Sequence, residues 1–490
     1  MSLFRRKVLT AQPAGRQLAR TLSWPHLMAL GVGSIVGTGI LTLIGVGADR
    51  AGPAVLVSFV VAGAICACAA LAYAEMATMI PASGSAYTYS YVVLGEVIAW
   101  VIGWSLILEY SLVVSTVAVG WSGYAVGVLK GIGVTLPDAL THGPTFAGHA
   151  CTGVARAAAF GINLPAVVII ALVAGLLTLG TRESARVNTA LVILKIVTLA
   201  LFVIVALPHF DAANLRPFAP FGYGSAGVHC DAQSGAMVKS GVMAAAAIIF
   251  FAFYGFDAIS TAAEETKRPE RDLAIGIVGS MAACTVIYLL VAAAAVGAAP
   301  FARFANSSEP LAMILRSLGQ KHVATVIAAA AAIALPTVIL GFLYGQSRIF
   351  LVMARDGFLP PQLAVLSRRG TPARVTAVTA TLVAVIAALT PLDVIASLAN
   401  AGTLAAFVAV AASVLVQRRR APDAARPFRV PLVWLIAPAA IGGCLYLFTS
   451  LQTVTQWAFL IWNTIGLLLY FGYARPRIGR LQQPDTQPQH

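Results

Sequence analysis

Two short stretches, residues 31–40 (GVGSIVGTGI) and residues 250–257 (FFAFYGFD), decide the fold of this chain. Each lies within a run of about twenty apolar residues, which is the length of a helix that spans a bilayer. The first stretch holds four glycines within nine residues, and each glycine costs a helix interior about 1 kcal/mol relative to alanine. We therefore expect both helices to be interrupted near mid-depth.

The composition around these stretches is that of a membrane protein. Of 490 residues, 59% belong to AVILMFWYC and 10% to DEKR, and the mean hydropathy is +0.87. An ordinary soluble enzyme is excluded, because its surface would need more charge. The alternation of apolar and polar residues that is typical of a transmembrane barrel is not seen. The apolar runs predict twelve spans, at 27–48, 54–76, 97–127, 163–181, 187–207, 242–263, 273–298, 323–353, 374–390, 394–416, 431–450 and 456–474.

The interrupted runs are the first and the sixth, so the two broken helices cross the membrane in opposite directions. This layout predicts an all-α polytopic membrane protein with twelve transmembrane helices and an inverted repeat of five plus five spans. The expected segments are a tail (1–26), a first repeat (27–207), an extracytoplasmic loop (208–241), a second repeat (242–416), a basic loop (417–430), two further spans (431–474) and a second tail (475–490).

The positive charges predict the orientation of the spans. If both termini share one side, most of the 32 Lys and Arg fall on that side, five of them in residues 417–430. We therefore expect a multi-pass protein of the cell (inner) membrane with both termini in the cytoplasm. The net charge of +14 then reflects topology and attraction to anionic lipid heads. It is spread over every inner loop, so nucleic acid is not an expected partner.

The two interruptions expose complementary backbone groups. A break in the first helix exposes N–H groups at the positive end of a half-helix dipole, which suit a carboxylate. A break in the sixth helix exposes carbonyls, which accept hydrogen bonds from an ammonium group. The predicted carboxylate ligands are the N–H groups of Ile35, Gly37, Thr38 and Gly39, and the predicted ammonium ligands are the carbonyls of Phe251, Ala252 and Tyr254. Close helix packing through Gly33 and Gly37 is the alternative for the first stretch.

Two ionisable residues lie deep within apolar runs. Lys195 lies about 12 Å from the inner end of the fifth run, at 1.5 Å of rise per residue, and is a candidate proton carrier because burial disfavours a charged amine. Glu109, in the third run, is either a second exchangeable group or a permanently protonated hydrogen-bond donor. Asp257 is expected to cap the second half of the broken sixth helix. Glu75 and Glu96 lie at span ends, where we expect them to be hydrated and structural.

The sequence predicts no metal, no cofactor and no enzymatic site. The seven histidines all lie away from mid-span positions, and the six cysteines lack metal-ligand spacing. Cys151 and Cys230 fall in the two longest outer loops. Cysteines can be oxidised on the outer side of the membrane. The sequence is compatible with a disulfide between these two cysteines and also with two unrelated thiols.

Several longer motifs resemble a known family. Residues 250–273 (FFAFYGFDAISTAAEETKRPERDL) resemble the sixth span and following loop of bacterial and animal cationic amino acid transporters, members of the amino acid, polyamine and organocation superfamily. Similar resemblance covers residues 31–40, 81–91 (PASGSAYTYSY) and 346–360 (QSRIFLVMARDGFLP). Glu109 and Lys195 also match the family by their positions in spans 3 and 5.

The resemblance implies secondary transport of amino acids, with the substrate held between the two broken helices. It also implies proton coupling, because a span 5 lysine in proton-coupled relatives takes the place of the cation bound by sodium-coupled ones, and Lys195 matches that lysine. Glu109 matches a span 3 glutamate associated with the site. We expect Phe342 to line the side-chain pocket with Glu109 and to shorten it against a long arginine chain. Leu41 departs from the family, which often has Phe there.

We therefore expect a proton-coupled symporter that imports amino acids by alternating access, and not an enzyme. One alternative is an amino acid exchanger, or a facilitated transporter of Arg and Lys, without net proton movement; a more distant one is a membrane amino acid sensor. The implied partners are an amino acid, a proton and the lipid bilayer. The sequence leaves open the preferred amino acid and whether a small single-span membrane protein or a sterol-like lipid docks alongside.

Overall fold

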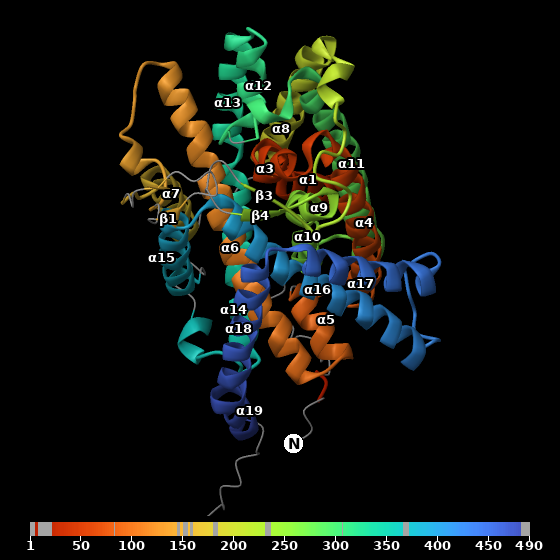
Figure 1. Ribbon diagram of the computed structural model, residues 1–490. Coiled ribbons are helices and arrows are strands. Elements are labelled where there is room, and N and C mark those ends of the chain that lie inside the picture. Colours follow the sequence, from red (N-terminus) through yellow and green to blue (C-terminus); the bar gives the residue numbers. More distant parts are fainter. Residues whose placement is uncertain are drawn as a thin grey trace, which may run out of the picture.

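The computed structural model describes residues 5–7, 22–82, 84–144, 148–149, 155–156, 160–179, 185–230, 237–305, 307–365 and 372–481. These residues are mostly helical, and the helices pack into a bundle (Figure 1). Among them, nine helical stretches are long and apolar enough to cross a membrane, and two shorter apolar helices cover Leu164–Thr178 and Ala373–Leu389. The prediction of an all-α polytopic membrane protein is confirmed, whereas the number of twelve spans stays a prediction.

The first half of the chain contains the first interrupted span, which forms three helices, and five further α-helices. Pro25 fits the first turn of α1, where a backbone N–H has no helical partner. In chain order the elements are α1 (Trp24–Ile35), α2 (Thr38–Leu41), α3 (Leu43–Ala51), α4 (Val55–Met79), α5 (Ser85–Val93), α6 (Glu96–Gly131), β1 (Gly148–His149), β2 (Ala155–Arg156), α7 (Leu164–Leu179) and α8 (Ala185–Ala206).

The second half begins with a hairpin and then the second interrupted span. Leu335–Pro336 divides the predicted eighth span into two helices. The elements are β3 (Gly227–Cys230), β4 (Met237–Ser240), α9 (Val242–Ile249), α10 (Asp257–Thr261), α11 (Pro269–Ala298), α12 (Pro310–Ser317), α13 (Lys321–Ala334), α14 (Pro336–Arg355), α15 (Ala373–Leu389), α16 (Leu392–Arg420), α17 (Val433–Ser450), α18 (Thr453–Leu469) and α19 (Arg475–Leu481).

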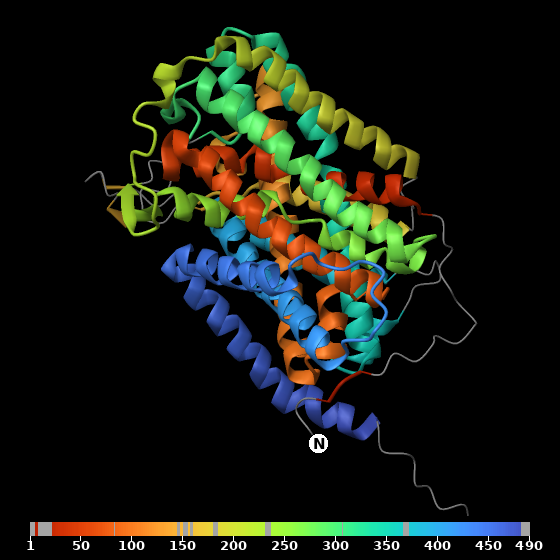
Figure 2. The same cartoon turned by 90° about the vertical axis from the view of Figure 1, so that its right-hand side faces the viewer.

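The two halves of the chain are interleaved. Helix α4 packs against α11, α6 against α14, and α7 against α15. Under the predicted inverted repeat, the two helices of each pair would occupy equivalent positions in the two repeats. Helices α17 and α18 lie along one side of the bundle (Figure 2). The broken spans are therefore surrounded by long, continuous helices that can act as a scaffold.

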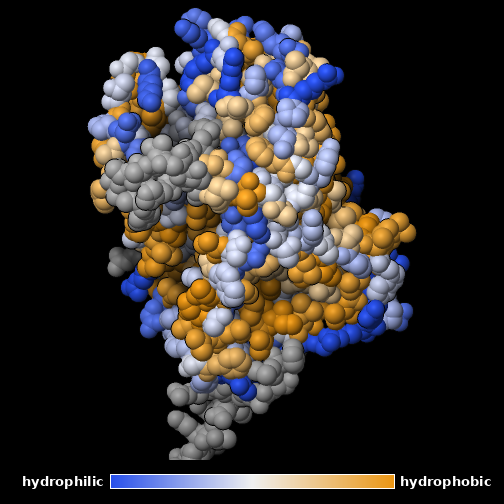
Figure 3. Space-filling model, viewed as in Figure 1, coloured by the Kyte–Doolittle hydropathy of each residue, from blue (hydrophilic) through white to orange (hydrophobic). Residues whose placement is uncertain are grey.

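The flank of the bundle is apolar. Ile204, Val286 and Val378 each expose 60–68% of their surface. On the face shown in Figure 3, hydrophobic residues cover much of the flank and hydrophilic residues gather at the upper end. A contiguous apolar surface of this kind requires lipid around it, because water would not cover it without cost.

The structure corrects the expectation that Glu75 is hydrated at a span end. Its side chain is buried, with Oε1 and Oε2 accepting hydrogen bonds at 2.8 and 2.7 Å from the Arg418 guanidinium. The backbone N–H of Val430 donates a third bond, at 2.8 Å. The reason is that the last turn of α16, which carries Arg418, and the loop after it, which contains Val430, lie over the end of α4. A buried carboxylate is tolerated here because it is paired.

A small antiparallel hairpin, β3–β4, lies at the end of α3 that is remote from α1. Gly227 lies opposite Ser240, and Nε2 of His229 is 2.9 Å from Oδ2 of Asp49 on α3. Cys230, at the end of β3, forms a disulfide. Cys151, the partner that the sequence suggested, lies outside the described residues.

Candidate functional site

The first predicted span is broken between α1 and α2. Helix α1 ends at Ile35, and α2 begins at Thr38 after Gly37, whose φ and ψ are −151° and −147°. The first N–H groups of a helix have no partner within it. The break therefore directs the N–H groups of Thr38 and Gly39 into the protein interior, where both residues are buried.

The sixth predicted span is broken between α9 and α10. After α9 ends at Ile249, a 3-10 turn covers Phe250–Ala252, and α10 begins at Asp257. Gly255, within the break, has a φ of +121°, which is a conformation that favours glycine. Local backbone bonds use the carbonyls of Phe250, Gly255 and Phe256 as acceptors.

The two breaks touch each other. A Cβ on Gly255 would lie 2.9 Å from the carbonyl carbon of Ser34, and a Cβ on Gly39 would lie 2.3 Å from the Cα of Ala252. Only glycine allows backbones to approach this closely. The predicted N–H donors and predicted carbonyl acceptors are thus brought together from stretches more than two hundred residues apart in the sequence.

Lys195 reaches the first break from α8. Its side chain is 3% exposed, and its Nζ donates a hydrogen bond to the carbonyl of Gly33 at 2.7 Å. Gly33 lies in the last turn of α1, whose carbonyls lose their helical donors at the break. The ammonium tip therefore lies in the protein interior beside the half-helix and not in bulk water.

Two tyrosines that the sequence analysis missed hold the same broken span. Tyr288 of α11 is buried, and its hydroxyl donates to the carbonyl of Ile35 at 2.8 Å. The hydroxyl of Tyr124 on α6 donates to the carbonyl of Leu41. A tyrosine within an apolar run can be recognised in the sequence, but the sequence does not show which backbone carbonyl its hydroxyl binds.

The predicted side-chain pocket lies beside aromatic rings. Phe342 is 2% exposed, with its ring centroid 5.3 Å from that of Tyr110 and 6.5 Å from that of Tyr254. Glu109 is 1% exposed, and its carboxyl oxygens have no hydrogen-bond partner within the described ranges. A Cβ on Gly402 of α16 would lie 3.1 Å from the Cβ of Glu109. A buried carboxyl with spare acceptor capacity calls for a proton or a donor.

Asp257 holds the second break from within. Its Oδ1 accepts from the N–H of Gly255 at 3.1 Å, and its Oδ2 accepts from the hydroxyl of Tyr110 at 3.0 Å. The carboxylate thus bonds to Gly255, two residues before the start of α10, and to Tyr110 of α6. Within the described residues, the expected capping of the second half-helix is not seen, because Asp257 is the first residue of α10 and the N–H that it binds belongs to the break. Its contacts are still structural, since they hold the break and join it to α6.

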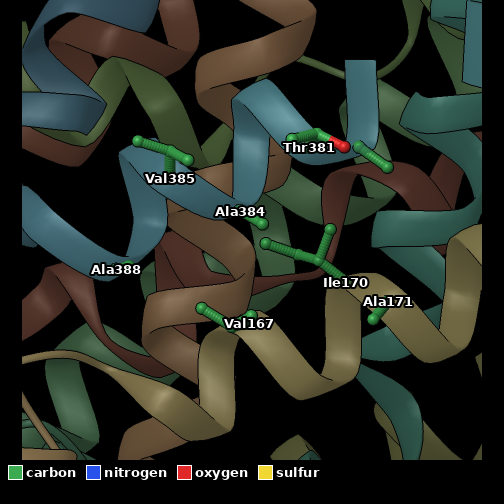
Figure 4. A pocket seen from close by; sticks show the side chains of 8 residues that line it. Val167, Ile170, Ala171, Thr381, Ala384, Val385 and Ala388 are labelled. Atoms are coloured by element: carbon green, nitrogen blue, oxygen red, sulfur yellow. The ribbon is translucent and has the colours of Figure 1, made fainter. Parts of the chain in front are cut away.

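A separate cavity of about 350 Å³ lies between α7 and α15 (Figure 4). Its lining is almost entirely apolar, with Thr381 as the exception, and contains no residue of the broken spans. It does not have the chemistry to hold a charged metabolite.

In the part of the chain that the structure describes, no three His, Cys, Asp or Glu side chains are grouped as a metal site would require.

Comparison with known proteins extends over nearly the whole chain. Residues 22–471 match the family model described as amino acid permease. The branched-chain amino acid permease BcaP of Bacillus subtilis (strain 168) is 44% identical over 479 residues, which are 97% of this chain and 98% of that protein. The methylthioribose transporter of the same organism is 42% identical over 479 residues, with the same coverage. Cationic amino acid transporter 3, mitochondrial, of Arabidopsis thaliana is 36% identical over 422 residues, 85% of this chain and 64% of the plant protein.

Proposed function

The chain belongs to the amino acid permease family, and on that premise we propose that it imports amino acids together with protons, by alternating access. Membership confirms the resemblance to the amino acid, polyamine and organocation superfamily. The relatives are named permeases and transporters, so the chain is treated as a transporter and not as an enzyme.

The observation that carries the proton coupling is the bond between Lys195 and α1. The Nζ of Lys195 donates to the carbonyl of Gly33 at 2.7 Å, at a buried position. A charged donor makes a stronger hydrogen bond than a neutral one. Loss of the proton would weaken the attachment of α1 to α8, so the two facing states would bind the proton with different affinity. That difference is what couples a proton to a conformational change.

The substrate would lie between the two breaks. Its carboxylate would meet the N–H groups of Ile35, Gly37, Thr38 and Gly39, and its ammonium the carbonyls of Phe251, Ala252 and Tyr254. The contacts of Gly39 with Ala252 and of Gly255 with Ser34 support this, because they bring both sets of backbone groups together. Glu109 and Phe342 would line the side-chain pocket.

The preferred substrate can be identified by a thermal-shift screen of the purified protein. The relatives bear the names of a branched-chain amino acid permease, a methylthioribose transporter and cationic amino acid transporters. The screen therefore includes all twenty amino acids and methylthioribose, because a ligand raises the melting temperature of the state that binds it. We expect stabilisation by one or more amino acids; stabilisation by methylthioribose alone would contradict the proposed substrate class.

Transport of the best ligand into liposomes tests the coupling. We expect an acidic outside to drive accumulation of the labelled ligand in vesicles containing the parent protein. Lys195→Ala should lower gradient-driven uptake by at least about tenfold, within the range of typical coupling free energies. The variant should still exchange internal for external substrate, because both breaks remain.

Lys239→Ala provides the matched control. Lys239 lies on β4, and its Nζ donates to the carbonyls of Thr449 and Leu451, away from both breaks. The Lys239→Ala variant should keep the response of uptake to the pH gradient. Full gradient-driven uptake by Lys195→Ala would remove Lys195 from the mechanism. Exchange that persists in the parent while a pH gradient has no effect would favour the exchanger or the facilitated transporter of Arg and Lys.

The remaining predictions about topology belong to the same proposal. Twelve spans, a five-plus-five inverted repeat and two cytoplasmic termini would place the basic loop between α16 and α17 in the cytoplasm. Labelling of single cysteines from each side of the membrane tests this. A cysteine in place of Asp423 in that loop should react only from the cytoplasmic side, and reaction from outside would contradict the orientation.

A further inference from the structure

Asn400 of α16 holds the second break from outside the broken helix. It is fully buried, and its Nδ2 donates to the carbonyls of Ala247 at 2.8 Å and Ile248 at 3.2 Å. Both carbonyls lie at the end of α9, immediately before the chain leaves the helix. Only the nitrogen of an asparagine amide can donate, so the two carbonyls fix which way the side chain faces.

The same arrangement occurs at the first break, with different chemistry. Lys195 of α8 donates to the carbonyl of Gly33, near the end of α1. Helices α8 and α16 are the fifth spans of the two proposed repeats, and α1 and α9 are the first halves of the two broken spans. In each repeat, a buried donor from the fifth span therefore binds the last turn of the first half-helix.

Both donors bind carbonyls at the C-terminal end of a half-helix, where helical hydrogen bonds are missing. The last four carbonyls of a helix lack helical partners, and a buried carbonyl without a donor costs about 1–3 kcal/mol. A side chain that supplies the donor also fixes the half-helix to its neighbour. Each half-helix is thereby tied to the surrounding scaffold at the end where the break allows it to pivot.

We infer that Asn400 is a positioning residue of the transport cycle and the counterpart of Lys195 in the second repeat. The correspondence rests on the proposed repeat and transport function. The two residues differ in one respect, which is that Lys195 can lose a proton and an amide cannot. The attachment of α1 thus responds to protons, whereas the attachment of α9 does not.

Two assays separate these roles. The first is counterflow, the exchange of internal unlabelled for external labelled substrate without a pH gradient; the second is the ratio of uptake with and without the gradient. Asn400→Leu keeps the approximate size of the side chain and removes the donor. It should lower counterflow by at least about tenfold, because the carbonyls of Ala247 and Ile248 both lose the amide donor that ties α9 to α16, and leave the gradient ratio unchanged. Lys195→Ala should lose the gradient ratio, and it should also lower counterflow, because the carbonyl of Gly33 loses its donor.

The control is Asn463→Leu. Asn463 of α18 also donates its Nδ2 to a backbone carbonyl, that of Phe459 on its own helix, and its Oδ1 accepts from the hydroxyl of Ser105 on α6 at 3.1 Å. Neither of these bonds involves a broken helix. The Asn463 variant should leave counterflow within about twofold of the parent, because the bonds that it removes do not hold a half-helix of a broken span. Asn400→Ala is the second test variant, because it also removes the donor and adds no group that could take up a proton and donate in its place. It should also slow counterflow, and it decides the question if the leucine variant does not fold.

Counterflow by either folded Asn400 variant within about twofold of the parent would overturn the inference. So would a variant that loses the gradient ratio and keeps counterflow, because Asn400 would then act in coupling. If the parent shows counterflow but no response to a pH gradient, proton coupling fails. Asn400 is then judged on counterflow alone.

Discussion

The breaks after α1 and after α9 meet the same requirement with different chemistry. Both leave backbone groups unpaired in the protein interior. After α1, a lysine and a tyrosine, Lys195 and Tyr288, donate to the carbonyls of the last turn. After α9, the amide of Asn400 takes that place, and Asp257 accepts from the N–H of Gly255. The first break is therefore held by an ionisable donor, and the second by an amide donor and by a carboxylate that accepts a hydrogen bond.

The backbone of the two breaks differs as well. Gly37 has a negative φ, −151°, and so lies outside the left-handed region that favours glycine. Gly255 has a φ of +121°, which an L side chain rarely adopts. The second break is therefore set by the backbone conformation of Gly255. The first break depends more on hydrogen bonds from side chains of α8 and α11. The first is better suited to respond to a proton.

The largest expected effect comes from alanine at Gly255. The new Cβ would lie 2.9–3.1 Å from the backbone of Ser34 and Ile35, at a φ that disfavours it. Backbone strain and overpacking each cost about 1–3 kcal/mol, so uptake should fall by roughly a hundredfold. Gly37→Ala is the matched control, because its Cβ would meet Val338 at an ordinary 3.4 Å. Equal losses in the two variants would contradict the difference between the breaks.

Tyr288→Phe should have an intermediate effect. The substitution removes only the hydroxyl that donates to the carbonyl of Ile35, and leaves that carbonyl buried without this donor. A penalty of about 1–1.5 kcal/mol corresponds to a five- to tenfold loss of uptake. Tyr446→Phe, on the exposed part of α17, is the control and should transport normally. Unimpaired uptake by the Tyr288 variant would mean that the first break does not depend on this donor.

Asp257→Asn should have the smallest effect. An asparagine keeps an oxygen for the N–H of Gly255, and its amide nitrogen can donate to the hydroxyl oxygen of Tyr110. Uptake should stay within about threefold of the parent, with an unchanged KM for substrate. Asp257→Ala should be worse, because it removes both acceptors. A strongly raised KM in the asparagine variant would instead indicate that the carboxylate contacts the substrate.

Much of the fold could be predicted from the sequence, because its determinants are local. Apolar runs of bilayer length predict spanning helices wherever they occur, and clustered glycine weakens a helix regardless of its neighbours. The same reasoning failed at Glu75. Its position at the end of an apolar run suggested hydration, but the basic loop that covers it comes from more than three hundred residues away in the sequence.

The candidate site was predictable in part. A lysine in mid-run is costly enough to stand out, so Lys195 could be selected without a structure. Tyr288 and Asn400 could not, since tyrosine and asparagine are common polar residues in spans and nothing in the sequence says what they bond. Their partners are backbone carbonyls, which carry no sequence signal of their own.

The sequence by itself determined that this chain lies in a membrane and that two helices are interrupted. Both properties follow from the local preferences of apolar residues and glycine, in the order in which they occur along the chain. Only the tertiary structure decided that the two interruptions touch, and that each is tied to the scaffold by a different kind of donor. Those facts depend on distances between residues far apart in sequence, and a hydrogen bond forms only where packing brings donor and acceptor within about 3 Å.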